Sequence, residues 1–147
     1  MNIVSISIER IDSDAKLPLY QHDGDAGMDI YSFEECVINP GERRLVRTGL
    51  RVEIPYGYEI QIRPRSGLAL KKGITVLNTP GTIDSGYRGE LGVMLINHDR
   101  REVKINRYDR IAQLVLNPVL RIKWVEKRVN IESSTRSTGG FGSTGTE

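Results

Sequence analysis

The stretch N78-T-P-G-T-I-D-S-G-Y-R-G-E-L-G-V-M-L-I-N97 has two parts that predict different structures. Residues 91–96 are apolar without helical periodicity, which indicates a well-buried strand. The residues before them are spaced as turn formers, because glycine and proline recur at short intervals. Among these turns lie a single carboxylate, Asp84, and an aromatic side chain with a polar tip, Tyr87. Taken alone, Asp84 could simply satisfy its own turn, since aspartate often hydrogen-bonds nearby backbone.

The rest of the chain repeats this pattern of short apolar segments between turn residues. The segments typical of strands are residues 4–8, 50–54, 58–62, 74–77, 103–105, 111–116 and 122–129. A Pro-Tyr-Gly turn at 55–57 predicts that the second and third of them form a hairpin. Residues 66–72 predict one short helix, with Ser66 as N-cap and Gly73 as its stop. Many strands and almost no helix predict an all-β sandwich or a jelly-roll-like β-barrel.

Composition limits the class of protein. The chain has 147 residues, of which 38% are hydrophobic and 27% charged, as expected for one soluble globular domain. The 21 Lys and Arg are spread along the chain and offset by 19 Asp and Glu, so we expect no nucleic-acid partner. We also expect no membrane partner and a cytoplasmic location, because no signal peptide or membrane-spanning apolar run is present. A single cysteine, Cys36, excludes an internal disulfide.

From residue 133 the composition changes to S133-S-T-R-S-T-G-G-F-G-S-T-G-T-E147. Small polar residues predict a mobile C-terminal arm, residues 133–147, after a folded body of residues 1–132. The arm contains G140-F-G-S-T-G145, but a dinucleotide fingerprint needs a strand before it and a helix after it. A solvated tag is one interpretation. The alternative is a nucleotide-binding arm, because glycine backbone, hydroxyls, Arg136 and Phe141 together suit a triphosphate and a base.

Two further segments could bind a ligand. In R63-P-R-S-G-L-A-L-K-K-G73, the residues Arg65 and Ser66 begin the predicted helix, where free N–H groups favour phosphate. An ordinary capped turn is the alternative. In Y108-D-R-I-A-Q-L-V115, Gln113 interrupts an apolar face, and a buried amide needs a partner. That partner could be structural or a ligand.

In their order along the chain, five segments resemble the motifs of the trimeric dUTPase family. They are D25-A-G-M-D-I-Y-S32, P64-R-S-G-L-A69, G81-T-I-D-S-G-Y-R-G-E-L91, D109-R-I-A-Q-L114 and R136-S-T-G-G-F-G-S-T-G145. Each motif alone is a weak or moderate match, whereas five in order across nearly the whole chain are specific. Two positions depart from the family pattern: Tyr108 replaces a usual glycine and Arg63 a usual small residue.

The resemblance implies a jelly-roll-like β-barrel of the β-clip type and a homotrimer whose active sites are shared between subunits. It implies Mg²⁺-assisted hydrolysis of dUTP to dUMP and pyrophosphate, which limits uracil incorporation into DNA and supplies dUMP for dTMP synthesis. The resemblance also implies that Asp84 activates the attacking water, Asp29 holds metal-bound water and Tyr87 packs on the deoxyribose. The other substrate-binding positions are, for uracil, Asn78, Thr82, Ile83 and Gly92; for the phosphates, Arg65, Ser66, Gly67 and Gln113; and for the closing arm, Arg136, Phe141 and Gly142.

Two rival functions share this predicted fold. The dCTP deaminase family carries a catalytic glutamate ten residues after the aspartate of the third motif, and Met94 occupies that position here. Methionine cannot shuttle protons, so the sequence argues against deamination. A non-catalytic nucleotide sensor is the second rival, and the intact Asp84, Tyr87 and Phe141 argue against it.

Overall fold

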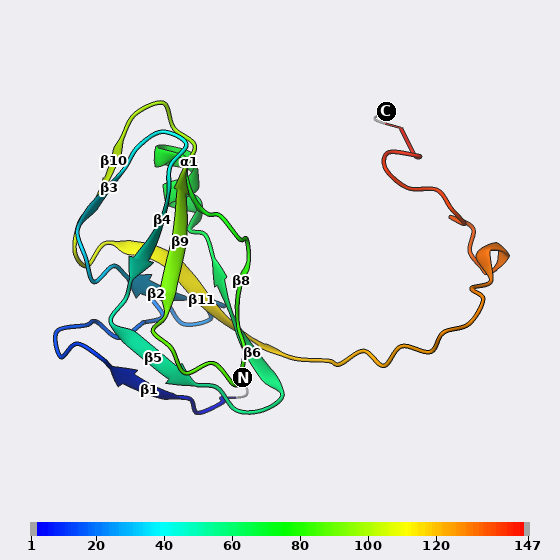
Figure 1. Ribbon diagram of the computed structural model, residues 1–147, viewed down its shortest axis with the longest axis horizontal. Coiled ribbons are helices and arrows are strands. Elements are labelled where there is room, and N and C mark those ends of the chain that lie inside the picture. Colours follow the sequence, from blue (N-terminus) through cyan, green and yellow to red (C-terminus); the bar gives the residue numbers. More distant parts are fainter. Residues whose placement is uncertain (1–2, 146–147) are drawn as a thin grey trace.

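Short strands run through most of the chain, and one α-helix interrupts them within residues 3–145, the part that the computed structural model describes (Figure 1). The strands are β1 (Ser7–Arg10), β2 (Met28–Tyr31), β3 (Cys36–Ile38), β4 (Arg43–Arg47), β5 (Leu50–Glu53), β6 (Tyr58–Arg63), β7 (Ile74–Val76), β8 (Gly81–Ile83), β9 (Gly92–Asn97), β10 (Val103–Ile105) and β11 (Arg110–Pro118). The helix α1 spans Ser66–Lys72, and a 3₁₀ turn, η1, spans Ile131–Ser133. This architecture confirms the predicted all-β class with one short helix.

All the strand pairs are antiparallel, and they form small ladders around one core. The longest sheet has the order β2-β11-β6-β8, and a second has the order β4-β9-β7. The pairs β1-β5 and β10-β3 complete the body. In the longest sheet, Gln113 on β11 lies opposite Asp29 on β2 and Arg63 on β6. The register therefore brings residues of different motifs to one region of the sheet.

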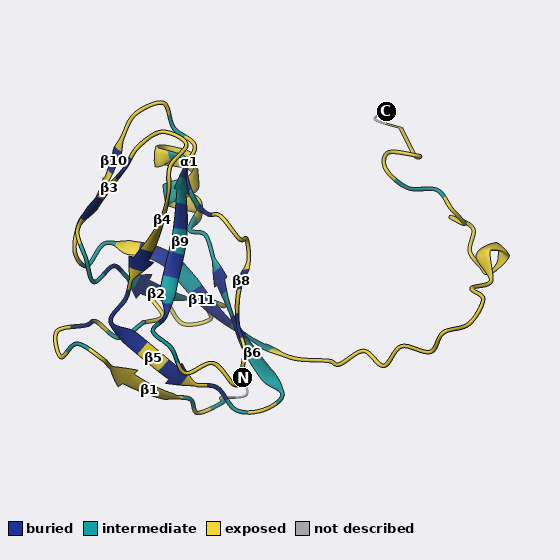
Figure 2. Cartoon of the chain, in the orientation of Figure 1, coloured by how far each residue is buried: buried dark blue, intermediate teal, exposed yellow. Residues whose placement is uncertain are grey.

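Alternating side chains of the strands build the core (Figure 2). On β9, Val93 and Leu95 are fully buried, whereas Met94 is half-buried, so the expected burial is complete on one face of the strand. Asn97 ends β9 inside the core, and its amide donates hydrogen bonds to the carbonyls of Ile38 (2.9 Å) and Arg101 (2.8 Å). These bonds offset the cost of burying the amide.

The predicted hairpin between residues 50–54 and 58–62 is wrong. A turn does follow Pro55, since the Tyr58 N–H donates to the Pro55 carbonyl at 3.2 Å. The two strands then part, because β5 pairs with β1 while β6 pairs with β11 and β8. Alternation predicts which face of a strand is buried, and in both of these strands the predicted face does reach the core. It does not specify which strand becomes the pairing partner.

The predicted strand at residues 122–129 is also wrong. After Pro118 the chain leaves the body and runs away from it in an extended conformation (Figure 1). Its apolar side chains are exposed, including Leu120, Ile122 and Trp124, the last 84% accessible. An alternating pattern forms a strand only when a partner edge is present, and no element of residues 3–145 pairs with this segment. The predicted first strand is displaced too, because β1 begins at Ser7.

The helix α1 matches its predicted range but not its predicted N-cap. Arg65 occupies the N-cap position with extended backbone angles and no side-chain capping bond, so Ser66 is the first helical residue. Gly73 ends the helix in the left-handed conformation, with φ 61°, as a C-terminal stop requires. No helix among residues 3–145 is long and apolar enough to cross a membrane.

Candidate active site

A polar cavity of about 350 Å³ lies where β2, β11 and the start of α1 meet. It gathers predicted residues from the first, second and fourth motifs. The lining residues are Gln21, His22, Asp25, Ala26, Gly27, Asp29, Arg65, Ser66, Gly67, Arg110 and Gln113. All the residues predicted to bind phosphate within the body therefore meet in one place, together with the predicted metal residue, Asp29.

The carboxylate of Asp29 is clamped between two arginines. Its Oδ1 lies 3.0 Å from Nε of Arg65, and its Oδ2 lies 3.2 Å from Nη1 of Arg110. Arg65 also donates through Nη1 to the Arg110 carbonyl at 2.9 Å. The Asp29 side chain is only 12% exposed, so its carboxylate is largely shielded from water, whereas the two arginine side chains stay partly exposed. Two guanidinium groups around one carboxylate leave a positive charge and further N–H donors beside the cavity, which suits an anion.

Arg110 was missed by the sequence reasoning. It stands in the fourth motif, where strand periodicity places it on an exposed face, and an exposed arginine has no distinctive sequence signal. Arg63, a departure from the family pattern, does not line the cavity. Its guanidinium donates to Oε1 of Gln61 on the same strand, at 3.1 and 2.8 Å.

Gln113 sits tightly against Gly27 of the first motif. A Cβ added at Gly27 would lie 3.1 Å from Cδ of Gln113 and would collide with its Oε1. The Gln113 amide donates through Nε2 to the Pro64 carbonyl at 3.0 Å. The amide therefore has a structural partner and also faces the cavity, and glycine at position 27 leaves room for it.

Ser66 and Gly67 begin α1 beside this clamp. Both are exposed, and the first turn of the helix carries no acidic residue. The N–H groups of a first helical turn have no partner inside the helix, so they remain available to an anion.

The residues predicted for uridine lie elsewhere on the body. Ile83 pairs with Ile60 on β6, so Asp84 leaves β8 next to that point. Arg65 lies five residues beyond Ile60 along an extended chain, which corresponds to about 16 Å at ~3.3 Å per residue. Neither Asp84 nor Tyr87 lines the cavity of the phosphate residues. A single chain therefore holds two separate halves of the predicted site.

The turn from Asp84 to Tyr87 is closed by backbone. The Tyr87 N–H donates to the Asp84 carbonyl at 3.0 Å, and the Tyr87 hydroxyl donates to the Glu90 carbonyl at 2.8 Å. Tyr87 is 46% exposed and packs against Gly89, where an added Cβ would collide with the ring. Within residues 3–145 the Asp84 carboxylate makes no hydrogen bond or ion pair, so it does not satisfy its own turn.

The other residues predicted for uridine lie on β8, at the start of β9 and in the turn that precedes β8. Asn78 and Thr82 are exposed, and Ile83 is buried. Gly92 begins β9 next to Leu45, whose Cδ1 would lie 2.6 Å from an added Cβ. Exposed polar groups close to a tight backbone are suited to reading the edge of a base.

The arm residues form a third group that the single chain does not join to the others. Arg136 donates through Nε to the Gly139 carbonyl at 2.9 Å, a contact within the arm itself. Phe141 is fully exposed, and Gly142 has a φ of 86°. The final predicted arm residues, 146–147, lie outside the described part of the chain.

The fold and the cavity define a small β-protein whose clustered polar and charged residues come from widely separated segments. The dUTPase family model matches residues 13–145, and the chain belongs to the dUTPase family. It is 57% identical over 141 residues to a deoxyuridine 5'-triphosphate nucleotidohydrolase of Alkaliphilus metalliredigens, covering 96% of this chain and 97% of that protein. A protein of the same name from Clostridium tetani is 51% identical over 145 residues, 99% of each chain.

Solved structures agree with this assignment. The dUTPase of Staphylococcus bacteriophage 80alpha with dUPNHPP matches with a TM-score of 0.85 and 29% identity, over 97% of this chain and 99% of that chain. A mutant dUTPase of phage phi11, described with a structural Mg(II) ion, matches with a TM-score of 0.77 and 28% identity, over 84% and 98%. These matches confirm the jelly-roll-like fold that the five motifs implied.

Proposed function

We propose that this chain hydrolyses dUTP to dUMP and pyrophosphate, and that Asp84 is the base that activates the attacking water. One observation carries the assignment of the base: the Asp84 carboxylate has no protein partner within residues 3–145, and it shares a turn with the exposed ring of Tyr87. A carboxylate left free beside a flat apolar surface is available to a water and a sugar. In the cytoplasm this reaction limits uracil in DNA and supplies dUMP.

The triphosphate would lie in the polar cavity. Ser66 and Gly67 offer first-turn N–H groups, Gln113 offers its amide, and Arg65 and Arg110 supply charge. Transfer at a phosphorus depends mostly on positioning and charge neutralisation, which these groups provide from fixed positions.

The uridine would bind at the Asp84 turn. Asn78, Thr82, Ile83 and Gly92 would read the uracil edge, and the Tyr87 ring would pack on the deoxyribose, leaving no room for a ribose 2′-hydroxyl. Thymine differs from uracil by one methyl group. A close backbone wall can exclude that methyl sterically, whereas extra affinity for uracil alone discriminates weakly.

The cavity is compatible with Mg²⁺ as cofactor. Among residues 3–145 there is no group of three or more His, Cys, Asp or Glu side chains that could cage a metal. Mg²⁺ needs no such cage, because it keeps several waters and takes phosphate oxygens as ligands. Asp29 can accept a metal-bound water while it holds both arginines, since a carboxylate has about four lone-pair positions. When bound, the ion would neutralise phosphate charge and orient the triphosphate.

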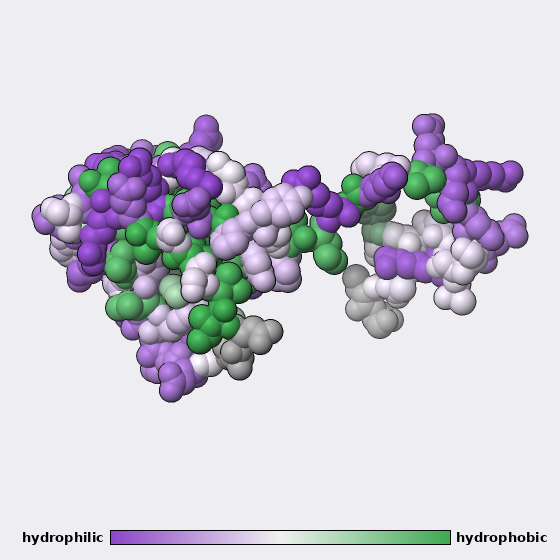
Figure 3. Space-filling model, turned by 90° about the horizontal axis from the view of Figure 1, so that it is seen from below, coloured by the Kyte–Doolittle hydropathy of each residue, from purple (hydrophilic) through white to green (hydrophobic). Residues whose placement is uncertain are grey.

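A complete site would require more than one copy of the chain, and the family form is a homotrimer. The two body halves of the site lie apart in one chain, and the arm contacts neither of them. Apolar side chains on the segment that leads into the arm are exposed, as Figure 3 shows beside the body. An apolar stretch of this length indicates a partner surface. Arg136, Phe141 and Gly142 of the arm would then close over a site on a neighbouring subunit.

The substitution Asp84→Asn tests this function. It keeps the size of the side chain but removes the base, so pyrophosphate release should fall by ~10²–10⁴-fold while a dUTP analogue still binds. Glu102→Gln is a matched control, because Glu102 is an exposed carboxylate that makes no hydrogen bond to the described residues, 3–145. Unchanged pyrophosphate release by Asp84→Asn would reduce Asp84 to a turn residue. Ammonia release from dCTP should be absent, since Met94 replaces the deaminase glutamate.

A further inference from the structure

The turn that carries Asp84 and Tyr87 is bound by a neighbouring arginine, Arg88. Its Nη1 donates to the carbonyls of Ser85 at 2.7 Å and Tyr87 at 3.0 Å. One guanidinium nitrogen thus joins two carbonyls of the same turn. Charge-assisted hydrogen bonds are the stronger kind, so Arg88 stiffens the backbone on which both functional side chains stand.

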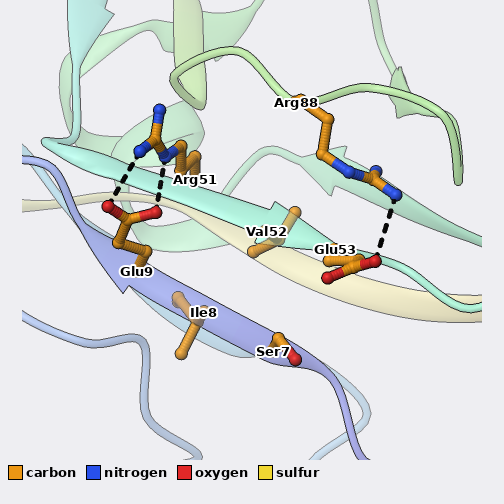
Figure 4. Close-up of a pocket in the computed structure, with 7 residues that line it drawn as sticks. All are labelled: Ser7, Ile8, Glu9, Arg51, Val52, Glu53 and Arg88. Carbon is orange, nitrogen blue, oxygen red and sulfur yellow. Dashed lines mark hydrogen bonds and ion pairs between the residues drawn. The ribbon is translucent and has the colours of Figure 1, made fainter.

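The same guanidinium reaches strand β5. Figure 4 shows Arg88 extending from its loop toward Glu53, whose Oε1 lies 3.5 Å from Nη2. Both side chains are more than half exposed, so this ion pair contributes little stability on its own. The ion pair instead orients the Arg88 side chain, because Glu53 keeps the guanidinium between β5 and the turn.

Glu90 anchors the far side of the same loop. Its carboxylate accepts a hydrogen bond from the Gly49 N–H at 2.8 Å and from Nε of Arg47 at 3.2 Å. The bond to Glu90 also raises the pKa of Arg47. Next in sequence, the Leu91 N–H donates to the Leu50 carbonyl at 2.7 Å. The loop is therefore fixed to the body after Tyr87 by these contacts and before Asp84 by the pairing of Ile83 with Ile60, whereas Arg88 provides the side-chain contacts within the turn between them.

We propose that Arg88 is a positioning residue that sets Asp84 and Tyr87 for catalysis and so helps this site to reject ribonucleotides. The proposal rests on the function above, in which Tyr87 packs against the deoxyribose. Tyr87 can exclude a 2′-hydroxyl only if its ring stays in van der Waals contact with the sugar, because a displaced ring leaves room for the hydroxyl. A shift of about 1 Å in such a group can cost ~10²-fold in rate.

The test compares Arg88→Gln with Arg51→Gln. Arg51 lies in the same pocket (Figure 4), is 47% exposed against 53% for Arg88, and pairs with a glutamate, Glu9, but does not touch the turn. Rates of pyrophosphate release from dUTP and UTP are measured for each variant, together with thermal unfolding. Arg88→Gln should lower kcat for dUTP by roughly ten- to a hundredfold. It should also raise the rate with UTP relative to dUTP by roughly tenfold.

Arg51→Gln should leave kcat for dUTP, and the rate with UTP relative to dUTP, at the wild-type values. Arg88→Lys keeps the charge but loses the planar fork, so it should give intermediate values, and it replaces Arg88→Gln if that variant does not fold. Wild-type rates and wild-type UTP to dUTP ratios in the Arg88 variants would overturn the proposal. A lower dUTP rate with an unchanged ratio would overturn it as well, because that is the result of a merely structural role. Failure of the wild-type chain to hydrolyse dUTP would instead refute the proposed function.

Discussion

The β body and the C-terminal arm hold their functional residues in opposite ways. In the body, Asp29, Arg65 and Arg110 are joined by contacts between segments that lie far apart in the chain. In the arm, Arg136 bonds to a carbonyl three residues away, and Phe141 is fully exposed. The difference teaches that the polar cavity of the body is formed in advance by contacts across the fold, whereas the proposed binding groups of the arm have no surface to bind within residues 3–145 of a single chain.

That division has an energetic consequence. Ordering a glycine-rich segment costs ~1–2 kcal/mol of backbone entropy per residue. The arm can meet this cost only if it gains contacts with a bound triphosphate and a partner subunit. Closure of the arm would then depend on substrate, while the phosphate cavity would not.

The largest expected effect comes from removing the arm. Deletion of residues 133–147 takes away no core side chain, so the melting temperature should change by less than about 2 °C. Hydrolysis of dUTP should fall by ~10³-fold or more, as when a phosphate-binding arginine is lost from a site of this kind.

Arg136→Gln should reproduce much of that loss at full chain length. Arg128→Gln, an exposed arginine before the arm, should not. Near-normal turnover by the truncated chain would make the arm a tag and remove the contrast with the body.

A mixing experiment sharpens the comparison, since it asks whether arm and body of one site belong to different chains. An Asp84→Asn chain supplies an intact arm, and an arm-deleted chain supplies an intact Asp84. After co-refolding at equal amounts, a site that draws these two parts from different subunits is complete in about a quarter of cases. The mixture should therefore regain roughly 25% of wild-type hydrolysis, if subunits mix at random.

Each variant refolded alone provides the baseline for this experiment. Subunit exchange is verified with a tag on one of the two chains. Mixed trimers no more active than the two variants refolded alone would show that each chain completes its own site.

A smaller effect is expected within the body, at Gly27. Gly27→Ala would push the Gln113 amide out of the phosphate cavity, so KM for dUTP should rise about tenfold, the effect of one lost hydrogen bond to a charged group. The cause is testable by a double-mutant cycle. In a Gln113→Ala background the side chain that clashes is gone, so Gly27→Ala should add little. Fully additive effects on KM would mean that Gly27 acts by another route.

Much of the fold could be predicted from local pattern, because alternation reports which side chains are buried. The α1 range and its Gly73 stop followed from such local signals, and so did β10. Partners could not be predicted, since strand pairing is decided by distant residues. This is why residues 50–54 were assigned to the wrong neighbour and residues 122–129 were expected to form a strand that this chain alone does not pair.

The site shows the same limit. Five ordered motifs pointed to residues such as Asp84 and Arg65, because the spacing of a motif is visible in the sequence. Arg110 and Arg88 were not identified, although both stand inside motifs. Their roles follow from contacts across the fold, to Asp29 and to the carbonyls of the Asp84 turn. Geometry of this kind has no signal in a single sequence.

The smallest expected effect concerns Tyr108, where this chain departs from the family pattern. Its backbone φ is 71°, a conformation that favours glycine. Three side-chain contacts offset the strain: the hydroxyl donates to the Asp14 carbonyl at 3.1 Å, and the ring lies 4.4 Å from Nζ of Lys16 and 4.8 Å from Cζ of Arg107. Strain and exposed contacts are each worth ~1 kcal/mol, so Tyr108→Gly should change the free energy of unfolding by less than about 1 kcal/mol.

Tyr108→Ala separates the two contributions, because alanine keeps the strained φ and loses the contacts. In urea denaturation it should be less stable than both Tyr108→Gly and the wild-type chain, by about 1 kcal/mol. Hydrolysis of dUTP should stay within about twofold of wild type in both variants, since the backbone N–H at 108 still donates to the Ser32 carbonyl, at 2.7 Å, and keeps Arg110 in register. If Tyr108→Ala were as stable as Tyr108→Gly, the left-handed backbone would carry no strain. The aromatic contacts would then add to the free energy of unfolding rather than compensate for the missing glycine.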